Sequence, residues 1–156
     1  MKTSKTAMVA VWTGAAAAAI AFASPAHADA PPVNLPVTDQ VAAELVQAGA
    51  VLTGRPASEF AGLREGKTYY AELPDSGTQY AAAALNSKPE FFEASVMLQD
   101  QNSYMMFYKS GKPGSTWIPK AIGFGPIPAG QAACPVPEPV RALWQWPAGK
   151  CYPPPT

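Results

Sequence analysis

The chain has 156 residues, only 14% of them charged, and its Lys and Arg are balanced by Asp and Glu to a formal net charge of zero. This composition excludes the basic excess that binding to nucleic acid or to an anionic membrane surface requires. The length suits one domain, which would bury roughly 65–70% of the surface of its unfolded chain.

Residues 1–28 have the pattern of a secretory signal peptide. Two early lysines precede an Ala-rich apolar stretch over 7–23, and Ala26-His27-Ala28 offers small residues at a cleavage site. A retained membrane anchor is the alternative, but the apolar run is short for a hydrocarbon core of about 30 Å. We therefore expect cleavage before Asp29, which leaves 29–156 as a single secreted domain with no membrane attachment.

Removal of the signal changes what chemistry the chain can support. Eleven Lys and Arg less Lys2 and Lys5 leave nine, against eleven Asp and Glu, and the only histidine, His27, is also lost. Without histidine, Ser-His-Asp and Cys-His catalysis are excluded, and so are zinc sites built on imidazole. We expect no metal and no cofactor.

A helix is predicted from Thr38 to Gly54. Thr38 is a good N-cap, Gly54 a good C-terminal stop, and Pro56 prevents continuation. Apolar residues between these limits recur at steps of three and four, as an amphipathic helix requires: Val41, Leu45, Ala48 and Leu52. A further helical turn is expected over 56–60.

From Lys67 the apolar pattern alternates, which predicts an antiparallel meander of four or five strands. Pro74-Asp75-Ser76-Gly77 has the composition of a hairpin turn. Ala81–Ala84 would also suit a helix, but the adjoining turn favours a strand. The expected strands are Thr68–Leu73, Thr78–Leu85, Phe91–Gln99, Ser103–Lys109 and Thr116–Ala121.

The C-terminal part predicts a short helix over Glu138–Trp146, tied back by a disulfide. Two thiols in one small exported domain usually pair, so we expect a bond between Cys134 and Cys151. Of Trp144 and Trp146, we expect one in the core and the other at the surface. The fold predicted is α+β: an N-terminal helix packed on the antiparallel meander, with a disulfide-tied C-terminal helical segment.

A tyrosine- and methionine-rich sheet face is the candidate binding surface. Side chains alternate across a strand, so if Phe107 faces the helix, then Tyr104, Met106 and Tyr108 face away from it. Tyr70 is expected beside them. Such side chains give large contact area at low entropic cost, which suits a protein or glycan partner. The alternative is that the C-terminal segment simply covers this face.

Two other functional hypotheses each depend on a single feature of the sequence. Glu72, Glu93 and Asp100 would support glycoside hydrolysis if two of their carboxylates faced one cleft. The loop Ser110–Ser115 has the position of a protease-inhibitor loop, but proline after Lys112 makes it a poor mimic of a cleavage site.

Several stretches together resemble small secreted actinobacterial proteins of unknown function. The resemblance covers nearly all of 29–156 and implies export and a single domain; it implies no catalytic residue. It rests on the Ala-rich signal, the stretch 48–56, Tyr69-Tyr70-Ala71, Gln99-Asp100 with Ser103-Tyr104 and Phe107, and the ending from Cys134-Pro-Val-Pro through Trp144-Gln-Trp146 to Cys151.

Taken together, these features favour a secreted, non-enzymatic binding or interaction protein. Its expected partner is an extracellular protein or a glycan, and neither a nucleic acid nor a membrane. A small carboxylate-dependent glycan hydrolase and a structural protein of the cell surface or matrix are the alternatives.

The first prediction concerns the mature N-terminus. N-terminal sequencing of the protein recovered from the medium of an expressing bacterium should read from Asp29, because the small residues before it fit signal peptidase. A protein that begins at Met1, or that sediments with the membrane fraction, would contradict export by cleavage.

Overall fold

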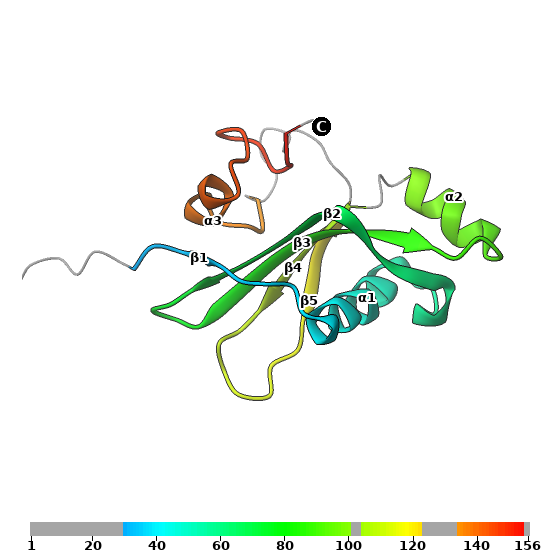
Figure 1. The fold of residues 1–156 in the computed structure, drawn as a ribbon, viewed down its shortest axis with the longest axis horizontal. Helices are drawn as coiled ribbons and strands as arrows, with labels where there is room; N and C mark the ends of the chain where they lie inside the picture. The colour runs from blue at the N-terminus through cyan, green and yellow to red at the C-terminus, as the bar shows by residue number, and fades with distance from the viewer. Residues whose placement is uncertain (1–29, 101–103, 123–133, 155–156) are drawn as a thin grey trace, which may run out of the picture.

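The computed structural model describes residues 30–100, 104–122 and 134–154, so the predicted signal peptide lies outside the described residues. Five strands form one antiparallel sheet in the order β1-β2-β3-β4-β5, with helices on both faces (Figure 1). The predicted α+β class is confirmed. The strands are β1 (Val33–Asn34), β2 (Phe60–Leu73), β3 (Thr78–Ser87), β4 (Tyr104–Lys109) and β5 (Ile118–Ile122).

The first helix, α1 (Asp39–Thr53), begins and ends where the sequence predicts. The hydroxyl of Thr38 accepts a hydrogen bond from the backbone N–H of Val41 at 3.2 Å, which satisfies one of the free donors of the first turn. Gly54 closes the other end in a left-handed conformation. A single 3₁₀ turn, η1 (Ala57–Glu59), follows as expected.

The strand predicted over Phe91–Gln99 is wrong: these residues form the helix α2 (Phe92–Asp100). The buried side chains are Ala94 and Leu98, four residues apart, whereas Phe92 is 76% exposed. That spacing places one side of a helix in the core, while a strand would have buried alternate residues. The chain therefore leaves the sheet after β3 and returns to pair β4 directly with it.

The fifth strand of the sheet is β1, which precedes the first helix in the chain and was not predicted. It pairs with the end of β2, Val33 opposite Glu72. β2 begins at Phe60, eight residues before the predicted start at Thr68, because residues 60–63 also pair with β3. The glycines at positions 62 and 66 weaken the strand pattern of residues 60–67, so the sequence did not predict a strand there.

The C-terminal helix, α3 (Glu138–Leu143), is three residues shorter than predicted. The predicted disulfide is present: Cys134 and Cys151 are bonded, with their Cα atoms 5.6 Å apart. Closing a loop of 17 residues is worth about 3 kcal/mol in the chain-entropy model. The bond closes the C-terminal segment on itself, so other contacts must hold that segment to the sheet.

Two separate cores lie on the two faces of the sheet. We call the first the helix-side core, since α1 and α2 cover it: Leu45, Ala48, Ala50, Phe60, Tyr70, Ala81, Ala83, Leu85, Ala94, Leu98, Met105, Phe107 and Trp117. We call the second the cover-side core, since the C-terminal segment covers it (Figure 1): Ala71, Ala82, Ala84, Tyr104, Met106, Val136, Val140, Trp144, Trp146 and Cys151.

Small residues allow α1 to approach the sheet closely. A Cβ added to Gly49 would lie 3.0 Å from both the Leu85 Cδ2 and the Met105 Sδ atoms, closer than carbon contacts normally allow. Opposite this helix, Ala81 and Ala83 of β3 are fully buried. The small side chains at the contact therefore set the distance between α1 and the central strands.

The C-terminal segment covers the Tyr/Met face, which is the alternative that the sequence left undecided. Tyr104 and Met106 do point away from α1, as the alternation predicts, but they are 1% and 3% exposed beneath the C-terminal segment. Burial raises the pKa of the Tyr104 hydroxyl far above its ordinary value. Trp144 and Trp146 are both buried over this face, which also corrects the expectation that one of them is at the surface.

Tyr70 does not join that face. It belongs to the helix-side core, where its ring lies 5.7 Å from that of Trp117. Its neighbour Tyr69 is the residue on the cover side, with its ring 5.4 Å from Trp144. The prediction placed Tyr70 on the wrong face, because strand alternation allows only one of these adjacent tyrosines to face the C-terminal segment.

The second prediction separates the buried tyrosine from the half-exposed one. Tyr104→Ala should lower the free energy of unfolding by about 3–5 kcal/mol, as expected for a buried ring. Tyr108→Ala should cost about 1 kcal/mol, the scale of its edge contact with Tyr80. Urea unfolding measures both changes in unfolding free energy. An equal loss in the two variants would contradict the burial of Tyr104 beneath the C-terminal segment.

Candidate functional site

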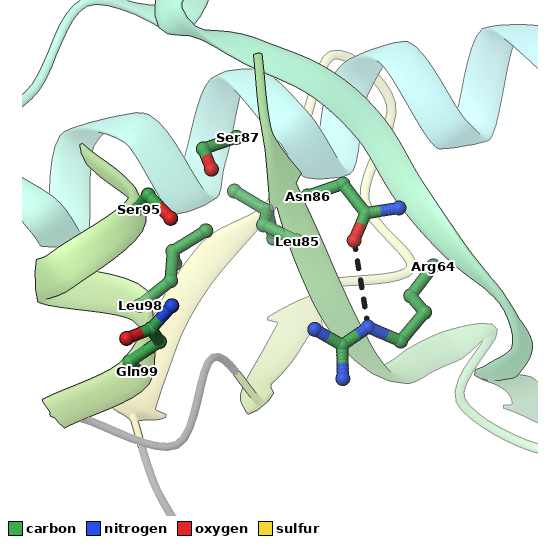
Figure 2. A pocket seen from close by; sticks show the side chains of 7 residues that line it. All are labelled: Arg64, Leu85, Asn86, Ser87, Ser95, Leu98 and Gln99. Atoms are coloured by element: carbon green, nitrogen blue, oxygen red, sulfur yellow. Dashed lines mark hydrogen bonds between the residues drawn. The ribbon is translucent and has the colours of Figure 1, made fainter. Parts of the chain in front are cut away.

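A polar pocket with a volume of about 420 Å³ lies between α2 and the β2–β3 pair. That size falls in the range of about 300–1,000 Å³ typical of small-molecule sites. Figure 2 shows side chains from three elements converging on it. The lining residues are Arg64, Leu85, Asn86, Ser87, Ser95, Leu98 and Gln99.

Irregular pairing of β2 brings Arg64 to this pocket. Leu63 pairs with Leu85 and Thr68 with Ala83, so that four residues of β2 lie opposite a single residue of β3. Gly66 supplies the left-handed backbone, φ 66°, that such a bulge needs and that a side chain would disfavour. The bulge therefore places a long cationic side chain where a regular strand would continue the ladder.

The pocket has an apolar floor and polar walls. Leu85 and Leu98 are buried members of the helix-side core and form the floor. Ser87 and Ser95 are half-buried, on β3 and α2 respectively, while Gln99 is exposed at the end of the helix. Hydroxyl and amide groups both donate and accept hydrogen bonds, so this lining suits a ligand rich in hydroxyl groups.

Arg64 is held at one side by Asn86. Its Nε donates to the Asn86 Oδ1 atom at 3.4 Å, a long hydrogen bond (Figure 2). Within the described part of the chain, no ion pair engages the guanidinium. The two terminal Nη groups therefore keep their donors for a ligand.

A second hollow, of about 450 Å³, lies between α1 and the segment that enters β5. Lys109 and Glu44 line it and pair with each other at 3.0 Å, and Lys109 also lies 5.6 Å from the Trp117 ring centroid. The hydrogen bonds from Lys109 and Gln40 hold the pKa of Glu44 below its ordinary value. Because its two charged side chains already neutralise each other, this hollow is the weaker candidate.

Two of the three carboxylates that suggested hydrolysis, Glu72 and Glu93, are not brought together. Glu93 binds Arg55, which also binds Glu59 just before β2, whereas Glu72 lies near the far end of that strand and accepts from Gln79. The β3 partners of the two ends, Ser87 and Gln79, are eight residues apart, or about 26 Å at 3.3 Å per residue.

A pair of catalytic carboxylates must lie about 5–10 Å apart. Glu72 and Glu93 therefore cannot act on one bond in this structure. The third predicted carboxylate, Asp100, is the last residue of α2, and its side chain lies outside what the structure describes.

Of the predicted binding residues, only Tyr108 remains at the surface. Its ring lies 5.7 Å from that of Tyr80, and Lys120 lies 5.7 Å from the Tyr108 ring centroid. Ile118, its partner on β5, is 46% exposed. These four residues form a small patch on the part of the sheet beside the covered area.

The sequence analysis missed the α2 pocket because it placed Phe91–Gln99 in a strand. On a strand, Ser95 and Gln99 would face the same side as Phe91 and away from Leu98. On the helix, Ser95, Leu98 and Gln99 share one side at steps of three and four. The spacing of Ala94 and Leu98 fits a helix as well as a strand, and only their burial in the structure decides for the helix.

Comparison with known proteins leaves the site to be interpreted from its own residues. No protein-family model, no curated protein and no solved structure matches the chain. In the described ranges, no helix is long and apolar enough to cross a membrane. Nor does that part of the chain contain three or more His, Cys, Asp or Glu residues grouped to hold a metal ion.

Proposed function

We propose that this is an exported, non-enzymatic binding protein that holds a small hydroxyl-rich ligand, such as a sugar, in the α2 pocket. Export is supported by the signal-like pattern of 1–28 and is compatible with the disulfide between Cys134 and Cys151. The resemblance to small secreted actinobacterial proteins agrees with this location.

The observation that carries the proposal is the lining of the pocket. Four of its side chains carry neutral hydrogen-bonding groups, namely Asn86, Ser87, Ser95 and Gln99, above a floor of two leucines. Sugars present many hydroxyl groups around their rim, which match these neutral donors and acceptors. The lining offers hydrogen bonds and one positive charge, which supports binding rather than acid–base catalysis.

The sugar site that we propose differs from the Tyr/Met face that the sequence predicted as a binding surface. The Tyr/Met face is buried, whereas the α2 pocket is open at the other face of the sheet, beside the helix-side core. An open pocket with half-buried polar groups is expected to bind a single sugar weakly, because water competes for each hydrogen bond.

The third prediction tests the pocket with a panel of neutral and acidic monosaccharides. Amide NMR shifts should change for residues 85–87 and 95–99 on addition of at least one sugar. Ser95→Trp should abolish the change by filling the pocket, and Ser58→Trp, at an exposed position of η1, is the matched control.

Circular dichroism of both variants confirms that they are folded. If no sugar in the panel shifts these amides, or if the shifts persist in the Ser95→Trp protein, the α2 pocket is not the binding site. Shifts that cluster instead at Tyr80 and Tyr108 would transfer the proposal to the half-exposed patch.

A further inference from the structure

The α2 pocket contains one positive charge, and its neutral hydrogen-bonding side chains do not account for that charge. Among the side chains that the structure describes around this pocket, Arg64 is the only charged one, and none is a carboxylate. A cation without an opposing charge in the same pocket favours an anionic ligand, and it disfavours a cationic one.

The geometry of Arg64 suits a carboxylate in particular. Arg64 is exposed, and Asn86 accepts only from its Nε atom, so the two Nη groups stay available to a ligand (Figure 2). In the figure these groups lie on the side turned away from Asn86. A planar fork with two parallel N–H donors matches the two oxygens of a carboxylate.

The side chains on the opposite side of the pocket determine which other chemical groups the ligand needs. Ser95, Leu98 and Gln99 lie on α2, across from Arg64 on β2, and Leu85 lies on β3 between these two elements (Figure 2). A simple inorganic anion would use only the guanidinium. A fatty or aromatic acid would leave the serine and glutamine groups without partners.

We propose that the α2 pocket recognises a sugar acid, with its carboxylate on Arg64 and its hydroxyl groups on Ser87, Ser95 and Gln99. This inference rests on the proposed function, since it names the class of ligand for the same pocket. Arg64 acts as a specificity-determining residue: it distinguishes an acidic sugar from its neutral counterpart.

Calorimetric titration of the whole protein with three probes is the fourth prediction. Glucuronate should bind at least about 10-fold more tightly than glucose, which has the same ring without the carboxylate, because a charge-assisted bidentate contact is stronger than a neutral one. Acetate, which has the carboxylate without the ring, should bind more weakly than glucuronate.

Arg64→Gln should reduce the affinity for glucuronate to that for glucose and leave the affinity for glucose within about 3-fold. Lys112→Gln removes the same charge at an exposed position in a distant loop, and it should leave both affinities unchanged. This control separates recognition by Arg64 from attraction by the overall charge of the protein.

Equal affinities for glucose and glucuronate in the unmodified protein would overturn the sugar-acid inference and leave the pocket as a neutral sugar site. Binding of glucuronate that survives Arg64→Gln would also overturn it. Failure of glucose, glucuronate and every other sugar of the panel to bind would instead overturn the proposed function itself.

Discussion

The fold depends on the burial of β3 on both of its faces. Ala81, Ala82, Ala83 and Ala84 are all 0–3% exposed, although successive side chains point to opposite sides of the sheet. A central strand of this kind needs a cover on each side. The chain supplies α1 and α2 on one side and the C-terminal segment on the other, and both must be in place for β3 to be excluded from water.

Small side chains on β3 leave room that the aromatic residues fill. On the cover side, Trp146 lies 5.2 Å from Trp144 and 6.3 Å from Tyr104, measured between ring centroids. Among the described residues, neither indole N–H has a hydrogen-bond partner, which costs about 1–3 kcal/mol each. Burying a tryptophan contributes about 3–5 kcal/mol, so packing outweighs this cost and holds the C-terminal segment in place.

The same arrangement explains how far the sequence could predict the fold. Local signals sufficed for α1, whose caps Thr38 and Gly54 are explicit, and for the disulfide, because only two thiols were available. Local signals failed at α2, because the spacing of Ala94 and Leu98 fits both a helix and a strand, and only their burial in the structure distinguishes the two. They also left open which segment covers Tyr104 and Met106, because packing between distant parts of the chain leaves no mark on local periodicity.

The pocket was beyond prediction for a related reason. Arg64 and Ser95 are 31 positions apart in the sequence and meet only because β2 bulges and α2 leaves the sheet. No sequence motif predicts the bulge or the position of α2. A lone arginine in a polar stretch is usually a solvated surface residue. The cluster can therefore be recognised only once both elements are placed.

The two-sided burial of β3 is tested most directly through the indole N–H signals in NMR spectra. After the expected cleavage, three tryptophans remain, with Trp117 in the helix-side core and the other two in the cover-side core. Ala82→Leu should shift the signals of Trp144 and Trp146 and leave Trp117 nearly unchanged, because overpacking acts on the face that the side chain enters.

Ala81→Leu, one residue earlier, should do the reverse. Ala81 pairs with Tyr70, whose ring contacts Trp117, on the helix side. Each substitution should cost about 1–3 kcal/mol of unfolding free energy. If both substitutions shift all three signals alike, or if Ala82→Leu leaves Trp144 and Trp146 unmoved, β3 does not separate two cores and the account of the fold is wrong.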